Sequence, residues 1–175
     1  MKPIVLSTLS LALCFLPAFG QSKMASKKMA SPMSEQAFVD FAGQTDMTEA
    51  HLGQLAQDQA DAQGVKDYGQ MLNTDHTKDY TDLSTAAASA GVQVPKGTDK
   101  KHDVMIDSLA KLKGTAFDHR FLHEMVSGHE GAIAEYNRYI SDGQNAALKT
   151  YATNALPVLQ KHLDDAKKLV SEKTK

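Results

Sequence analysis

Three histidines, His76, His129 and His162, recur on the apolar stripes of three different amphipathic segments, and Glu49 lies on the stripe of a fourth. Burying a titratable side chain costs free energy unless that side chain is paired or bound to a metal ion. One such residue could be an accident of packing, but four of them, one per segment, indicate a polar site inside a helical bundle. Three imidazoles and a carboxylate are suitable ligands for zinc, copper or iron.

The same four residues admit a second interpretation, in which a hydrogen-bonded network fixes the register of the helices and binds nothing. Under the metal hypothesis, Asp75, Asp79 and Asp165 are candidates to orient a ring N–H, because they neighbour the histidines in sequence. Met71 and Met125 lie within about one helical turn of a histidine. They would favour copper if their thioethers point inward.

The other histidines differ in their position on the helices. His102 faces inward on a short connecting segment and is the fifth candidate ligand, where it either closes the site or only packs. His119 and His123 form an i, i+4 pair that points away from the apolar stripe, so we expect a solvated face, with a surface metal site as the alternative. His51 is also off the stripe and is expected to be exposed.

The elements that must position these residues are helices, because apolar residues recur at helical spacing and no strand pattern competes. Ser34 is placed to cap the first helix, and Gly91 to end the second. Pro157 falls inside the last helix, where it should kink the helix or free a backbone carbonyl. The long helices are expected over residues 34–62, 65–90, 115–141 and 145–172, and a short one over 99–112.

Tight turns join the first two long helices and the last two, whereas a long crossover joins the pairs. This order predicts an all-α fold, a ferritin-like four-helix bundle whose long crossover carries a short helix. The crossover makes the second and third long helices parallel. Glu49, His76 and His129 then come to similar heights in the bundle, and His162 lies within about one turn of them.

The start of the chain predicts export. Residues 1–20 have the basic start, apolar run and small residues of a signal peptide, with cleavage expected after Gly20, which indicates a periplasmic or secreted protein. Residues 21–33 are expected to form a flexible basic leader, and residues 34–172 the helical bundle. The leader's methionines are an alternative set of thioether ligands for Cu(I): Met24, Met29 and Met33.

Composition and motifs narrow the classes of function. The formal net charge is −2 over 175 residues, and no basic cluster indicates binding to nucleic acid. The only cysteine, Cys14, falls in the expected signal peptide, so the core alone must hold the exported chain. We find no Gly-rich phosphate loop, nucleophile elbow or cysteine nucleophile, so a non-enzymatic protein is favoured over a hydrolase or redox enzyme.

Three segments carry a family resemblance: HLGQLAQDQA…VKDYGQMLNTDHTKDYTDL, KHDVMIDSLAKLKGTAFDHRFLHEMVSGHE and LKTYATNALPVLQKHLDDA. They resemble the bacterial family called domain of unknown function 4142, over roughly residues 34–171. The family pattern falls here on Glu49, Asp75-His76, Lys101-His102, Phe117-Asp118, Met125 with His129, and Leu156-Pro157 with His162. The resemblance implies a ferritin-like helical bundle in the cell envelope, where peripheral association with the envelope is an expectation. Members of the family are often labelled outer-membrane or periplasmic proteins. It implies no established biochemical role.

The chain departs from iron-oxidising ferritins, because it lacks the Glu-x-x-His motif that those proteins carry on two helices. Di-iron chemistry is therefore disfavoured. The content of methionine and histidine is loosely similar to that of periplasmic copper-binding helical proteins. The sequence thus predicts an exported envelope protein that binds one copper or zinc ion. The alternative is a structural or stress-response protein without enzymatic activity, and the sequence identifies no protein partner.

Overall fold

Helices begin and end close to the positions that the sequence predicts. The computed structural model describes residues 32–173, which form five α-helices and no strand. Each observed boundary lies within three residues of the predicted one, and the all-α class is confirmed. The helices are α1 (Glu35–Gln59), α2 (Gln63–Ala90), α3 (Lys100–Ala110), α4 (Gly114–Asp142) and α5 (Ala146–Lys173).

Local signals explain these boundaries. The Ser34 hydroxyl accepts a hydrogen bond from the Ala37 N–H at 3.2 Å, which satisfies an otherwise free donor at the start of α1. Gly91 follows α2 with φ of 72°, a left-handed conformation that glycine adopts without strain. Pro157 lies inside α5, and the helix continues through it.

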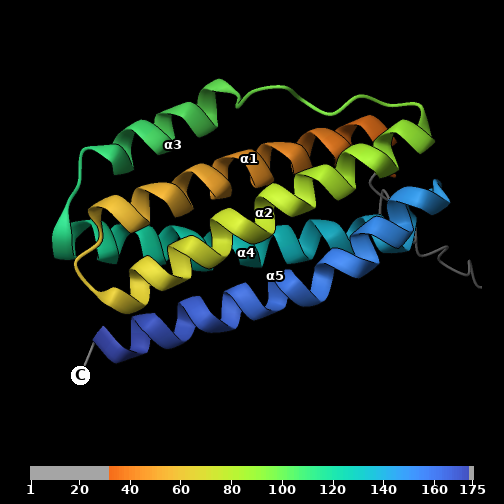
Figure 1. Cartoon of the computed structure of the whole chain (residues 1–175). Coiled ribbons are helices and arrows are strands. Elements are labelled where there is room, and N and C mark those ends of the chain that lie inside the picture. The colour runs from red at the N-terminus through yellow and green to blue at the C-terminus, as the bar shows by residue number, and fades with distance from the viewer. Residues whose placement is uncertain (1–31, 174–175) are drawn as a thin grey trace, which may run out of the picture. The chain divides into compact units, whose positions relative to one another are not determined.

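The four long helices form two antiparallel hairpins, α1 with α2 and α4 with α5, joined by a long crossover that contains α3 (Figure 1). The hairpins meet where α2 packs against α5 and α1 packs against α4, while α3 covers α1. Helices α2 and α4 run in the same direction (Figure 1). The bundle with a long crossover carrying a short helix therefore matches the sequence prediction.

Glycines bring α1 and α2 close together. A Cβ atom on Gly53 would lie 2.5 Å from the carbonyl oxygen of Gly69, and one on Gly69 would lie 2.5 Å from the Cβ of Ala56. Real Cβ atoms do not approach other atoms so closely, so this contact requires glycine on both helices. The first hairpin is thereby held at a fixed spacing one to two turns from Glu49.

The core consists of two apolar clusters separated by a polar layer. On every long helix at least one buried polar residue falls between residues of the first cluster and residues of the second. The first cluster contains Phe38, Val39, Ala42, Leu83, Ala87, Ala132, Tyr136, Tyr139, Leu148, Tyr151, Ala152, Ala155 and Leu159. The second contains Leu52, Ala56, Ala60, Val65, Tyr68, Leu72, Ile106, Leu109, Phe117, Phe121, Leu122, Met125 and Ala166.

Asp118 links the two hairpins at one end of the bundle. Its buried carboxylate accepts hydrogen bonds from the backbone N–H groups of Asp61 and Ala62, at 3.0 and 3.1 Å. These donors lie in the turn between α1 and α2 and have no helical partner there. Asp118 thus satisfies the backbone N–H donors of the α1–α2 turn and is not part of the polar layer.

The expected signal peptide and nearly all of the expected leader lie outside the described residues. Met33, the last residue of that leader, is described, and it packs against the first apolar cluster. Within residues 32–173, no helix combines the length and the apolar character needed to cross a membrane.

Candidate metal centre

The polar layer at mid-bundle contains buried side chains from all four long helices. Helix α1 contributes Asp46 and Glu49, α2 contributes His76, α4 contributes His129 and α5 contributes His162. None of these residues is more than 5% exposed. One nitrogen of each histidine lies within 4.8 Å of the corresponding nitrogens of the other two.

Glu49 faces two of the histidines. Its Oε2 atom lies 2.8 Å from His76 Nε2 and 3.1 Å from His129 Nε2. Although these distances are short, the oxygen lies off the direction of a ring N–H, so neither contact has hydrogen-bond geometry. Five buried atoms of these residues have no hydrogen-bond partner. One is Asp46 Oδ2, and the other four lie among the three rings: Glu49 Oε2, His76 Nε2, His129 Nε2 and His162 Nδ1. Unpartnered buried polar atoms are rare, and these four occupy one place.

The opposite ring nitrogens of His76 and His129 are both held. His76 Nδ1 lies 2.9 Å from Asp46 Oδ1, and His129 Nδ1 donates to the backbone carbonyl of Met125 at 2.9 Å. A carbonyl oxygen only accepts, so Nδ1 of His129 carries the proton and Nε2 presents its lone pair. The proton that His76 shares with Asp46 lies on the Nδ1 side, so a neutral His76 also presents Nε2.

In His162 it is Nε2, instead of Nδ1, that is held by a hydrogen bond. Its Nε2 atom donates to Asp75 Oδ2 at 3.0 Å, which leaves the lone pair on Nδ1. Its backbone carbonyl accepts a hydrogen bond from the Tyr68 hydroxyl at 3.1 Å, which fixes this turn of α5 against α2. All three rings therefore follow the pattern of metal-binding histidines, in which the far N–H is bound by a carboxylate or a carbonyl.

The rings surround a common point. The ring centroids lie 5.9 Å apart for His76 and His129, 5.2 Å for His76 and His162, and 5.3 Å for His129 and His162. Ligand atoms bound at about 2.1 Å to one tetrahedral ion would lie about 3.4 Å apart. Movements of the side chains by about 1 Å would therefore close the site around an ion.

Electrostatics couples Glu49 with His76. Burial disfavours the charged form of Glu49, but His129 and His76 outweigh burial and lower its pKa to about 2. Burial also disfavours the imidazolium of His76, but the charge of Glu49 and the hydrogen bond with Asp46 outweigh burial and raise its pKa to about 10. Without a metal ion, Glu49 and His76 therefore form a buried ion pair near neutral pH.

The pKa values of Asp46 and His162 shift in the direction that burial favours. Burial raises the pKa of Asp46 to about 7, because it outweighs the hydrogen bond and the charge of His76. Burial lowers the pKa of His162 to about 4, and the neighbouring His76 adds to this shift, although the hydrogen bond with Asp75 opposes it. The His162 ring is therefore neutral across the physiological range.

The structure brings Glu49, His76, His129 and His162 together, whereas the fifth candidate, His102, is not in the group of three histidines. His102 lies on α3, where its Nδ1 contacts the carboxylate of Asp99 at 2.8 Å, the residue that also caps α3. The ring is tied to its own helix, so it does not complete the centre.

Sequence reasoning missed Asp46, which holds the His76 ring. Its signal was a second carboxylate three residues before Glu49, a spacing that places both on one face of a helix. Of the carboxylates proposed to orient a histidine, only Asp75 does so, and its partner is His162 on another helix. Asp79 accepts a hydrogen bond from the Tyr151 hydroxyl, and Asp165 pairs with Lys161.

The remaining candidates lie away from the centre. The Met71 sulfur accepts a hydrogen bond from Lys161 Nζ at 3.3 Å. Met125 is buried one helical turn before His129. His51, His119 and His123 are exposed, as expected, and the rings of the last two lie 4.5 Å apart.

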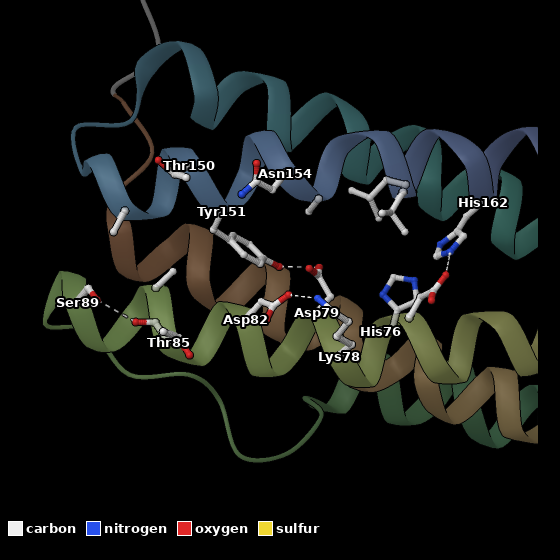
Figure 2. A pocket seen from close by; sticks show the side chains of 16 residues that line it. His76, Lys78, Asp79, Asp82, Thr85, Ser89, Thr150, Tyr151, Asn154 and His162 are labelled. Carbon is white, nitrogen blue, oxygen red and sulfur yellow. Dashed lines mark hydrogen bonds and ion pairs between the residues drawn. The ribbon is translucent and has the colours of Figure 1, made fainter.

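A cleft of about 760 Å³ between α2 and α5 reaches the centre. His76 and His162 point toward each other from the two helices at one end of this cleft, and Asp79 and Tyr151 lie farther along it (Figure 2). A smaller cavity of about 280 Å³ lies on the other side, among residues of α1, α3 and α4, and Glu49 lines it. The centre thus has open space on two sides.

Comparison with known proteins gives a structural neighbour and a family. A secreted protein described as DUF305, from Streptomyces coelicolor, superposes with a TM-score of 0.62 at 13% identity, covering 81% of this chain and 95% of its own. At this identity the likeness concerns the fold alone. No curated protein matches the sequence. The model of the family "Domain of unknown function (DUF4142)" matches residues 19–169, and the chain belongs to this family.

Proposed function

We propose that this protein binds one transition-metal ion, copper or zinc, through His76 Nε2, His129 Nε2, His162 Nδ1 and Glu49 Oε2. One observation carries the proposal. These four buried atoms have no hydrogen-bond partner, while the far nitrogen of every ring is held by a carboxylate or a carbonyl. Glu49 Oε2 contacts two of these nitrogens only outside hydrogen-bond geometry, and His162 Nδ1 has no hydrogen-bond partner, so the four atoms are left available to an ion.

The donor set favours a borderline ion. Three neutral imidazoles and one carboxylate suit zinc and copper, whose protein sites are rich in histidine. Di-iron sites in helical bundles use several bridging carboxylates, whereas here Glu49 is the carboxylate that contacts two of the histidines, and Asp46 holds the far nitrogen of His76. The low pKa of Glu49 keeps it anionic, as a ligand must be.

A structural network remains the second candidate, and the Glu49–His76 ion pair supports it. The shifts of both groups describe a stable charged pair in the absence of metal. Such a pair could set the register of α1 against α2 and bind nothing. This candidate predicts that removing a histidine changes stability and abolishes no ligand.

We further propose that the protein acts outside the cytoplasm, as a buffer or carrier without enzymatic activity. The support is the signal-like start of the chain and a structural neighbour that is described as secreted. We also propose that the protein associates peripherally with the cell envelope, for example with the outer membrane.

Equilibrium dialysis of untagged protein tests the metal proposal. We expect about one zinc or copper ion per chain, measured by mass spectrometry of the metal, and loss of that ion in His129→Ala. His123→Ala is the matched control, because this histidine is exposed on the same helix, and it should retain the ion. Absence of bound zinc, copper and iron from the unmodified protein would refute the proposal.

Thermal unfolding separates the two candidates. Zinc at about 1,000 times its dissociation constant stabilises the folded state by about 4 kcal/mol, so Tm should rise by about 10 °C. In His129→Ala the rise should vanish while circular dichroism still shows the helical fold. A structural network predicts instead that zinc leaves Tm unchanged in the unmodified protein.

A further inference from the structure

A second group of soft donors lies beneath α3, in the cavity of about 280 Å³. The side chains of His102, Met105 and Met125 all line this cavity. Two of them come from α3 and the third from α4, so the crossover brings them together. Met125 is 2% exposed and Met105 is partly buried, so both thioethers are shielded from bulk water.

As in His76 and His129 of the candidate metal centre, Nδ1 of His102 contacts an oxygen atom of the protein. The contact of its Nδ1 with the Asp99 carboxylate, at 2.8 Å, places the ring proton on Nδ1. In the neutral tautomer that this contact favours, Nε2 presents its lone pair. An imidazole with its far N–H held by a carboxylate is prepared to bind a metal ion.

Glu49 separates this cavity from the central site. Its Oε2 contacts His76 and His129, whereas a Cβ on Gly128, which lines the cavity, would lie 3.4 Å from Oε1. The absent side chain at Gly128 thus leaves Oε1 open toward the cavity. Thr48, which is 3% exposed, also lines the cavity, and its hydroxyl has no hydrogen-bond partner. One buried polar side chain, that of Thr48, therefore borders this space with an unsatisfied hydroxyl.

We propose that this cavity is a second metal site, specific for a soft monovalent cation such as Cu(I), with His102 Nε2 and the sulfur atoms of Met105 and Met125 as its ligands. Thioethers select Cu(I) over zinc, because soft sulfur donors bind soft ions. Besides Glu49, two charged residues line the cavity, Lys101 and Glu124. The carboxylate of Glu124 pairs with Arg120. Neither competes with sulfur for a soft ion.

The inference extends the proposed function, because Glu49 then lies between two ions of different character. It does not require the central site to be occupied, since the three soft donors are separate from His76, His129 and His162. Met125 connects the two sites, because its side chain lines the cavity and its backbone carbonyl holds His129.

Methionine-methyl NMR of the full chain, with Ag(I) as a redox-stable probe for Cu(I), tests the inference. The protein is labelled with 13C at the methionine methyl groups, and each resonance is assigned by a Met→Leu variant. Ag(I) at one equivalent should shift the resonances of Met105 and Met125. If it shifts only methionines outside the cavity, or none, the site does not exist.

Substitutions measure the contribution of each donor. Met105→Leu keeps the side-chain volume but removes the sulfur, so it should preserve the fold and weaken Ag(I) binding at least about tenfold. His102→Gln should do the same. Met71→Leu is the matched control, because Met71 is also partly buried but does not line the cavity, and it should leave the affinity unchanged. Equal affinities for Met105→Leu and Met71→Leu would overturn the assignment.

Zinc binding distinguishes this inference from the proposed function. His129→Ala should abolish zinc binding and leave the Ag(I) shift of the Met105 methyl group in place. Met105→Leu should leave zinc binding unchanged. A protein that binds zinc without the Ag(I) shifts keeps the proposed function and loses the second site, and the reverse result loses only the proposed function.

Discussion

Asp46 contributes to the candidate metal centre through another side chain. Its carboxylate holds His76 Nδ1 at 2.9 Å, and this contact directs Nε2 toward Glu49 and the other rings. Such partners of a ligand typically change metal affinity by about 10- to 100-fold when they are removed. Asp46 is therefore a positioning residue whose effect is measurable only through the ion.

We predict that Asp46→Asn weakens zinc binding by about 10- to 100-fold while the stoichiometry stays at one ion. The amide still accepts a hydrogen bond but no longer carries the charge that favours a proton on Nδ1. Competition with a chromophoric chelator measures the affinity. Asp107→Asn, which removes one exposed carboxylate, serves as the control. Equal affinities of the two variants would contradict this role of Asp46.

His76 makes metal binding dependent on pH. Its pKa is raised to about 10, so the metal-free protein holds a proton on this ring near neutral pH, and the ion must displace it. Apparent affinity should therefore rise by about tenfold for each pH unit below this pKa, with release of about one proton. Calorimetry in buffers of different ionisation enthalpy counts the proton. An affinity that is constant with pH would show that His76 is not a ligand.

The sequence predicted burial correctly where a polar side chain interrupts an apolar stripe, as with Glu49 and the three central histidines. It missed Asp46 because its neighbour Thr45 fitted the stripe equally well. The structure shows that the Thr45 hydroxyl bonds to the Phe41 carbonyl of its own helix, which leaves Asp46 as the buried polar residue. For His102 the sequence left two alternatives, closing the site or only packing, because spacing cannot reveal that the Asp99 carboxylate contacts its ring.

At the scale of elements, the helix boundaries were predictable because caps, glycines and apolar periodicity all agree. The contact of α2 with α5, however, depends on how the two hairpins face each other, which no local signal decides. The close approach of α1 and α2 was also missed. A glycine inside a helical pattern is ambiguous from sequence, because its packing reason lies on another helix.

Two glycine substitutions should have opposite effects on stability. Gly53→Ala places a methyl group against the backbone of α2, so we expect a loss of about 1–3 kcal/mol. In Gly131→Ala the new methyl group meets nothing within 4 Å, so the higher helix propensity of alanine should stabilise by about 0.5–1 kcal/mol. Chemical denaturation measures both, and a stabilised Gly53→Ala protein would contradict the observed packing.

At the scale of the whole molecule, the polar layer divides the core, and an ion in it would connect all four long helices. The two apolar clusters lie on either side of the polar layer, so each cluster would be adjacent to a bound ion along every long helix. Binding should therefore stabilise the bundle as one unit instead of a single hairpin.

Hydrogen exchange tests this expectation. Zinc at about 1,000 times its dissociation constant should increase the protection of core amides in α1, α2, α4 and α5 by a similar factor of about 1,000. The effect should be absent in His162→Ala. Protection confined to α4 and α5, or to α1 and α2, would show that the ion does not connect the hairpins.

The division of ligands between the hairpins has a consequence for assembly. Glu49 and His76 belong to the first hairpin, and His129 and His162 to the second, so each hairpin carries half of the centre. The long crossover is the covalent link between the halves (Figure 1). Two chains that exchange hairpins would therefore rebuild two complete centres, each shared between chains. If ions occupied these shared centres, each ion would join one hairpin from each chain.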